Sequence, residues 1–269
     1  QSNYVLKDNF GFENGKLIMS VQELDSVIAL QRYEIDSNYI RSSGLELLEG
    51  YRHRFRYSTA LLWSKKEFLY GHFQIRFRGV SGRGIWPAFW LYGGNPNFEI
   101  DFFELKGERP ALLHVDVHCP DGCANLKEGI FGYRRGWGHW VKLDKELYET
   151  FNLLSCQWTP ERITWFLNGQ RIAMFNKKID VPMALIIGTG AARDDGPFKP
   201  GPDENTPFPN YFIVDHVRVF SAKKKPVDSL ADFPEMVPAG NYEAEELAYK
   251  KSPRLKYAPR GIKRDQQIF

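Results

Sequence analysis

The sequence predicts an all-β protein built as a sandwich or barrel of short antiparallel strands. Segments in which apolar and polar residues alternate recur along the chain, and glycine, proline and asparagine separate them. No long amphipathic helical pattern competes with these segments. The 269 residues suffice for one large sandwich with an ample core.

Alternation defines seven expected strands and one long loop. The strands are expected at 51–57, 71–78, 113–118, 152–158, 162–166, 184–188 and 211–220. The proline- and glycine-rich segment 193–209 is expected to be a loop, and loops of that length are usually functional or mobile.

Three carboxylates, Glu99, Asp101 and Glu104, lie within an otherwise apolar segment of six residues. Alternation puts Glu99 and Asp101 on one strand face and Glu104 on the other. One extra residue in a β-bulge at Phe102–Phe103 would return Glu104 to the carboxylate face. Most acidic triplets belong to solvated edge strands, but the apolar neighbours here predict burial. The expected row of interacting acids suits acid/base and nucleophilic chemistry.

The preceding strand carries two tryptophans, Trp86 and Trp90, which are four residues apart and so share a face. Ala88 lies between them and leaves room, while Phe89 and Leu91 are expected to face the core. Tryptophans of this kind either fill a core or form flat binding surfaces.

The strand after the acids alternates His114, Asp116 and His118 with apolar residues, so one face is polar. Zinc binding by these three is disfavoured, because strand positions i and i+4 lie ~13 Å apart. The segment 133–140, which mixes Arg135 with Trp137, is expected to be a loop.

Charge and cysteine content exclude some classes of protein. A net charge of +3 is too small to indicate nucleic-acid binding. No apolar run approaches the ~18 residues needed to span a bilayer.

Cys119 and Cys123 flank a turn that either a disulfide or two free thiols would fit. Residues 221–269 carry ten Lys/Arg against seven Asp/Glu, so we expect a domain at 1–220 and a basic extension at 221–269, packed on the sandwich or partly disordered.

Together these motifs resemble glycoside hydrolase family 16, including its laminarinase-like members. The resemblance rests, in the family's order, on 64–71 (SKKEFLYG), 84–91 (GIWPAFWL), 99–104 (EIDFFE), 157–163 (QWTPERI) with Asn168–Gly169, and 214–220 (VDHVRVF). It implies a concanavalin A-like β-jelly-roll sandwich of two antiparallel sheets with an open substrate cleft. It also implies retaining, usually endo-acting, hydrolysis of β-linked polysaccharides.

The resemblance assigns roles to the acids. Glu99 matches the nucleophile and Glu104 the acid/base, while Asp101 keeps Glu99 ionised and Glu104 protonated. Retention requires the two working carboxyl groups to lie ~5–5.5 Å apart. A tryptophan of the 84–91 motif stacks on a sugar, and Trp86 is favoured over Trp90.

Other residues follow from the resemblance. His118 best matches a family histidine that approaches the substrate, and Trp137 and Arg135 are further substrate-binding candidates. Asp215 stands where many members bind a structural calcium, although the chemistry itself needs no cofactor. Asn152 stands near a position where the family often has histidine.

The WPAFW motif resembles glucan-cleaving members and favours a β-1,3- or mixed-linkage glucan. The arginines at 52, 54 and 56 keep an agarase, porphyranase or carrageenase type of galactan hydrolase as an alternative. A transglycosylase and a lectin-like carbohydrate-binding module are the others, although a binding module need not keep all three acids. We expect a monomer whose partner is a polysaccharide and whose location is secreted, periplasmic or at the cell surface, because such polymers are too large to enter cells.

Overall fold

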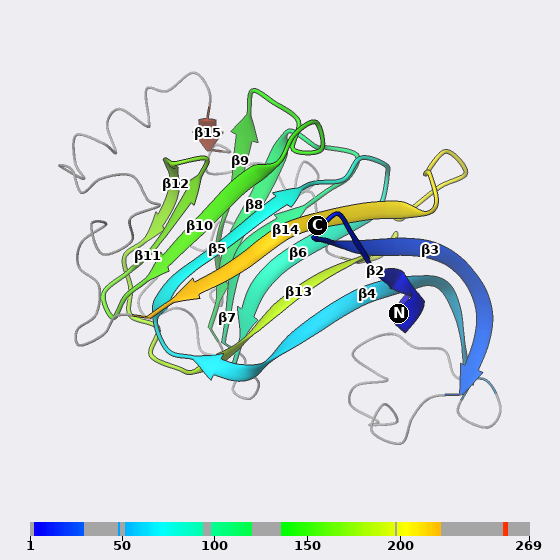
Figure 1. Cartoon of the computed structure of the whole chain (residues 1–269), viewed down its shortest axis with the longest axis horizontal. Coiled ribbons are helices and arrows are strands. Elements are labelled where there is room, and N and C mark those ends of the chain that lie inside the picture. The colour runs from blue at the N-terminus through cyan, green and yellow to red at the C-terminus, as the bar shows by residue number, and fades with distance from the viewer. Residues whose placement is uncertain are drawn as a thin grey trace.

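The computed structural model describes residues 3–29, 48, 52–93, 98–119, 136–196, 198–221 and 255–257. Apart from the 3-10 turn η1 (Lys7–Asn9), its regular elements are strands (Figure 1). They are β1 (Asn3–Val5), β2 (Phe10–Glu13), β3 (Lys16–Ala29), β4 (Arg52–Phe68), β5 (Gly71–Arg78), β6 (Ile85–Tyr92), β7 (Glu99–Leu105), β8 (Leu112–His118), β9 (Gly136–Leu143), β10 (Asn152–Trp158), β11 (Ile163–Leu167), β12 (Gln170–Phe175), β13 (Met183–Ala191), β14 (Asn210–Phe220) and β15 (Leu255–Tyr257).

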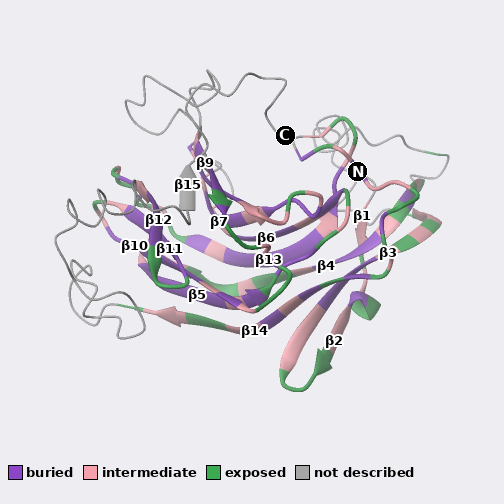
Figure 2. Cartoon of the chain, turned by 90° about the horizontal axis from the view of Figure 1, so that it is seen from above, coloured by how far each residue is buried: buried purple, intermediate pink, exposed green. Residues whose placement is uncertain are grey.

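The strands form two packed layers, which Figure 2 shows from above. Their order in the sheet is β12-β11-β10-β5-β14-β3-β4-β13-β6-β7-β8-β9-β15. The outer layer contains β12, β11, β10, β5 and β14, the inner layer contains β13, β6, β7, β8 and β9, and β3 and β4 join the two layers. All pairs are antiparallel except β1 with β4. The expected all-β sandwich is confirmed. Within the part of the chain that the structure describes, there is no helix long and apolar enough to cross a membrane.

Alternation along the strands fills the space between the layers with aromatic rings. On β5, Phe73 and Phe77 are fully buried, and on β6 Phe89 is buried as expected. The ring of Phe73 lies 5.0 Å from that of Phe102, and the ring of Phe77 stacks on that of Phe103 at 4.5 Å. Large aromatic contacts of this kind contribute strongly to core stability, and here they fix β7 against the opposite layer.

Segment 136–143 is a strand, not the loop expected at 133–140. Its register on β8 sets Trp140 opposite His114 and Trp137 opposite Val117. In the basic extension, the described residues 255–257 form β15 on the edge of β9, with Tyr257 opposite Val141.

The expected loop at 193–209 contains no strand among its described residues and is tied to the inner layer. Lys106, at the end of β7, donates a short hydrogen bond to the carbonyl of Lys199. Arg83 donates to the carbonyl of Gly201 at 3.1 Å, and Thr206 Oγ1 donates to the carbonyl of Arg83 at 3.0 Å. These bonds place the loop beside the start of β6 and the end of β7.

Candidate active site

The three acids of β7 lie on one face of the inner layer because the strand is bulged. Asp101 pairs with Asp116 and Glu104 with His114, so three steps along β7 match two along β8. The register against β6 shifts at the same place. The predicted bulge at Phe102–Phe103 is confirmed, and it turns Glu104 to the side of Glu99 and Asp101.

Contacts within the core stabilise the bulge. Phe102 and Phe103 are both fully buried, so two successive side chains point inward. From the outer layer, the indole Nε1 of Trp165 donates to the carbonyl oxygen of Asp101 at 3.1 Å. Buried backbone groups need such partners, and this bond satisfies a carbonyl next to the irregular position.

Two side chains hold the carboxyl group of Glu104. Trp86 Nε1 donates to Oε1 at 3.2 Å, and His114 Nδ1 lies 3.1 Å from Oε2. The side chain of His114 is 1% exposed, and its ring lies 4.6 Å from that of Trp140. With both oxygens engaged, the orientation of this carboxyl group is restricted.

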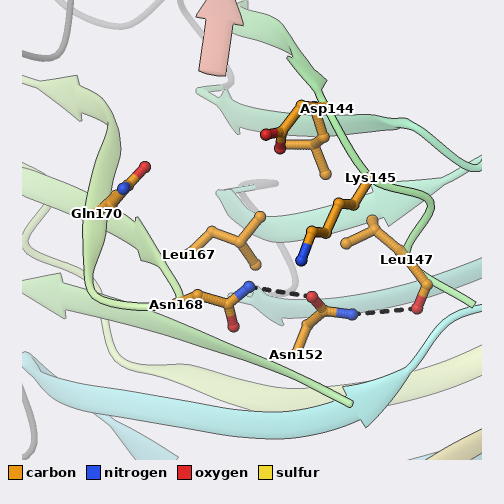
Figure 3. A pocket seen from close by; sticks show the side chains of 8 residues that line it. Asp144, Lys145, Leu147, Asn152, Leu167, Asn168 and Gln170 are labelled. Atoms are coloured by element: carbon orange, nitrogen blue, oxygen red, sulfur yellow. Dashed lines mark hydrogen bonds between the residues drawn. The ribbon is translucent and has the colours of Figure 1, made fainter. Parts of the chain in front are cut away.

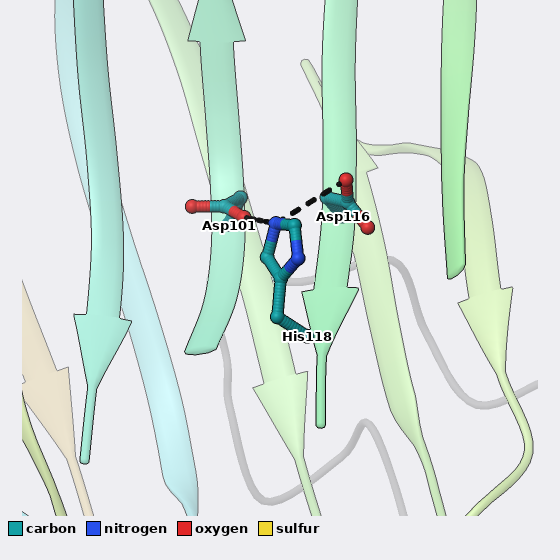
Figure 4. Close-up of side chains that lie close together, drawn as sticks. All are labelled: Asp101, Asp116 and His118. Atoms are coloured by element: carbon teal, nitrogen blue, oxygen red, sulfur yellow. Dashed lines mark ion pairs between the residues drawn. The ribbon is translucent and has the colours of Figure 1, made fainter. Parts of the chain in front are cut away.

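His118 lies between two other acids (Figure 4). Its Nε2 is 3.4 Å from Oδ2 of Asp101 and 3.4 Å from Oδ2 of Asp116. Asp116 is itself held by the backbone N–H of Val117 at 2.7 Å, and its Oδ2 lies 4.0 Å from Nε2 of His114. Imidazole and carboxylate groups therefore alternate along the face from Glu104 to Asp101.

Burial and the nearby negative charges raise the pKa values of the acids in this row. Burial raises the pKa of Glu99 to about 7, with His118 opposing the rise and Glu104 and Asp116 adding to it. Burial, followed by the charges of Glu99 and Glu104, holds the pKa of Asp101 well above its usual value. Burial also raises the pKa of Asp116. Groups with perturbed pKa values that share one face are typical of catalytic sites.

His118 supplies the positive charge. Burial alone would lower its pKa, but the hydrogen bond to Asp101 and the charges of Asp116, Asp101 and Glu99 raise it to about 11. One imidazolium thus faces three carboxyl groups, so the row retains at least one proton over a wide pH range.

Asp101, Asp116 and His118 are also the one group of three potential metal ligands among the residues described, with ligand atoms within 4.8 Å of one another. A protonated imidazole cannot bind a metal through its ring nitrogens. The arrangement therefore fits charge pairing better than metal binding.

Asp215 is not in that group. Its Oδ2 pairs with Arg76 at 2.9 Å and with His216 Nδ1 at 3.0 Å. Hydrogen bonds from these two residues lower its pKa. Calcium sites gather six to eight oxygen ligands, whereas this carboxylate faces nitrogen donors, so these residues do not fit the expected calcium.

The tryptophans of β6 differ in their surroundings. One face of the Trp86 ring stacks in parallel on Phe198, at 4.5 Å between centroids, so part of this ring is covered. Trp90 is half-buried, and its partner positions across the sheet are Asp101 and Ile186. Both remain sugar-stacking candidates, with Trp86 also bound to Glu104.

Trp137 is a correction to the sequence interpretation. It lies opposite Val117 on the core side of β9, and its ring stacks on Trp165 at 5.5 Å and packs against Phe175 at 5.2 Å. Trp137 therefore fills the core and does not face the acids. Arg135 lies outside the described residues.

The cysteines divide into two kinds. Cys119 is disulfide-bonded, whereas Cys156 is a free buried thiol. The third cysteine, Cys123, lies outside the described residues. Cys119 follows β8 directly, so this covalent bond lies close to His118 in sequence.

A pocket of about 310 Å³ is lined by residues such as Lys145, Asn152 and Asn168 (Figure 3), and no residue of the acidic row lines it. Asn152 points into this region, donating to the carbonyl of Leu147 at 3.1 Å and accepting from Asn168 at 3.0 Å. Its side chain therefore ties neighbouring segments together and does not line the acidic row.

Sequence reasoning missed the residues that support the acids. His114 was placed on the correct face but without its partner Glu104. Trp140 and Phe198 were not singled out, and Phe198 reaches the site from a loop distant in sequence. Gly138 was also missed: a Cβ there would lie 3.0 Å from both Asp116 Cγ and His114 Nε2, so glycine makes room for this pair. Alternation within 136–143 is the signal that could have placed Trp140.

The chain is similar in sequence to curated proteins that are named as glucan-cleaving enzymes. The chain is 31% identical over 178 residues to a beta-glucanase of Rhodothermus marinus, covering 58% of this chain and 59% of that protein. It is 31% identical over 124 residues to a glucan endo-1,3-beta-glucosidase of Cryptopygus antarcticus, covering 42% of each. The chain thus matches roughly half the length of these curated relatives.

Solved structures share the fold. The laminarinase catalytic domain of Thermotoga maritima superposes with a TM-score of 0.63 at 22% identity, over 83% of this chain and 84% of that one. The endo-beta-1,3-glucanase of Pyrococcus furiosus gives a TM-score of 0.61 at 26% identity, over 82% and 80%. The sequence model described as glycosyl hydrolases family 16 matches residues 7–194. The chain belongs to glycosyl hydrolases family 16.

Proposed function

We propose that this protein is a retaining endo-β-glucanase that hydrolyses a β-1,3- or mixed-linkage glucan. The observation that carries the proposal is the bulged strand β7, which puts Glu99, Asp101 and Glu104 on one face. The names of the two curated relatives, a beta-glucanase and a glucan endo-1,3-beta-glucosidase, support this class of substrate.

The reaction would proceed in two displacements. A carboxylate oxygen of Glu99 attacks the anomeric carbon while the carboxylic acid of Glu104 gives its proton to the departing glycosidic oxygen. The C–O bond to the leaving sugar breaks and a glycosyl ester of Glu99 forms. Glu104, now a carboxylate, takes a proton from water as the water attacks the same carbon. The ester bond then breaks, which restores both acids.

The neighbours of the acids suit this division of work. Trp86 and His114 orient the proton donor Glu104. His118 and Asp101 lie beside Glu99, and the positive charge of His118 favours the ionised nucleophile. Burial and the neighbouring acids raise the pKa of Asp101, and in its protonated form Asp101 would donate a hydrogen bond to the Glu99 carboxylate without adding another negative charge.

The direct test is to incubate the purified protein with laminarin, lichenan, agarose, porphyran and carrageenan side by side. We expect cleavage of laminarin or lichenan in the chain interior, with β-configured reducing ends as the first products by NMR. Initial α-products would refute retention, and cleavage of the galactans alone would refute the glucan assignment. Glu99→Gln should be folded and inactive, and near-normal turnover by this variant would refute its role.

The name of one relative supports cleavage of a β-galactosidic bond as an alternative. The chain is 26% identical over 186 residues to a keratan-sulfate endo-1,4-beta-galactosidase of Sphingobacterium multivorum. A transglycosylase would form the same covalent intermediate and pass the sugar to another glycan. Product analysis with an added oligosaccharide acceptor separates transfer from hydrolysis.

We also infer that the protein acts outside the cytoplasm. The disulfide at Cys119 fits an oxidising compartment, and a polymeric glucan is too large to enter cells. Fractionation of producing cells tests this inference, and recovery of the protein only with cytosolic markers would refute it.

A further inference from the structure

We propose that Trp63, on β4, is a stacking platform for a sugar of the glycan far from the cleaved bond. This inference rests on the proposed function, because it concerns how the same substrate is held. Trp63 is 53% exposed, and β4 lies next to β13, at the end of the inner layer opposite to β8 and β9.

The sheet register puts Trp63 in line with the acids. Ile186 of β13 pairs with Trp63 on one side and with Trp90 on the other. Trp90 in turn pairs with Asp101. Directly opposed residues share a face, and neighbouring strands lie ~4.8 Å apart, so Trp63 stands about 14 Å from Asp101 across the strands.

Contacts confirm that Trp63 and the acids share a face. The ring of Trp63 meets that of Tyr92 edge to face, at 6.0 Å and 86°. Tyr92 pairs directly with Glu99. The indole is therefore supported on one side by a residue next to the expected nucleophile.

Beside this row on β13, Gly188 pairs with Leu61 and Ala88 and leaves room for the side chains of its neighbours. A Cβ at Gly188 would lie 2.7 Å from Cδ1 of Leu61 and 3.7 Å from Cη2 of Trp90. The Trp90 ring thus reaches over β13 toward β4. Together Trp90, Tyr92 and Trp63 form an aromatic surface that leads from the acids toward β4.

This surface suits a pyranose chain. The apolar C–H face of a sugar ring can pack on the exposed indole while its hydroxyl groups stay in water. A single exposed apolar side chain is ordinary on a protein surface. Trp63 differs because it continues the face that carries the acids, and its contact with Tyr92 limits its rotation and so the entropy lost on binding.

The experiment compares Trp63→Ala and Trp63→Phe with Phe12→Ala. Phe12 is a matched control because it is 83% exposed but lies on β2, whose partner is β3. For Trp63→Ala we expect KM for laminarin or lichenan to rise roughly tenfold with kcat nearly unchanged. Cleavage of a short aryl glycoside should be unaffected, and Trp63→Phe should recover most of the affinity.

Unchanged KM in Trp63→Ala, or an equal rise in Phe12→Ala, would overturn the platform. A binding assay separates this failure from that of the proposed function. In the inactive Glu99→Gln background, affinity electrophoresis in laminarin or lichenan gels should show weaker retardation once Trp63 is also replaced. Equal retardation refutes the platform alone, and no retardation of Glu99→Gln by either glucan refutes both proposals.

Discussion

Replacing Glu99 by glutamine is expected to stabilise the protein at neutral to alkaline pH while abolishing its activity. A pKa of about 7 in place of 4.5 means that holding Glu99 ionised in the fold costs about 3 kcal/mol. Because its folded-state pKa is raised, Glu99 costs no stability below about pH 4.5, where it is protonated in both states. The cost grows between about pH 4.5 and 7, where only the unfolded chain ionises, and is complete above about 7. Glutamine is nearly isosteric and carries no charge, so it removes this cost.

The gain should therefore depend on pH. Urea unfolding of the wild type and Glu99→Gln should give equal stability near pH 4 and a difference approaching about 3 kcal/mol above pH 7. For a domain of this size that corresponds to a rise in Tm of roughly 6–12 °C. Glu13→Gln, at an exposed site on β2, is the matched control and should change little. A gain that is the same at pH 4 and pH 8, or a loss of stability at pH 8, would refute the reasoning.

Two further variants probe the support of the acids. His114→Gln should slow polysaccharide cleavage by about 10²–10⁴ because the proton donor Glu104 loses its orientation, and should affect aryl glycosides with good leaving groups much less; equal losses on both substrates would contradict this. Gly138→Ala puts a Cβ 3.0 Å from Asp116 Cγ and should destabilise the protein by roughly 1–3 kcal/mol in urea and lower kcat. Gly11→Ala, whose Cβ meets nothing closer than 3.9 Å, is its control, and equal behaviour of the two variants would argue against crowding at Gly138.

Local patterns in the sequence predicted the features that depend on the alternation of side chains along a strand, namely the bulge in the acidic strand and the buried face of the preceding one. The odd spacing between Glu99 and Glu104 implied a bulge because strand side chains alternate strictly. The same rule placed Phe89 in the core. Trp137 was misassigned because its neighbours have the composition of a loop, and only pairing with β8 decides which way its ring points.

Contacts between distant segments could not be predicted in this way. Phe198 stacks on Trp86 only because its loop is bonded to the end of β7. Trp63 is separated from the acids by 36 or more residues of chain, and only the order β4-β13-β6-β7 puts it in line with them. Sheet order follows from the whole fold and leaves no local signal.

At the bulge at Phe102–Phe103, the alignment of the acids and the filling of the core depend on different residues. Asp101 and Glu104 face Asp116 and His114, which are two residues apart, so the acids already occupy the positions of a regular ladder. Deleting one of the two phenylalanines would leave the acids aligned and remove a ring from the core, at a cost of about 3–5 kcal/mol. The strand could therefore lose one residue here, which would change how thickly the layers are filled, without moving the acids off their shared face.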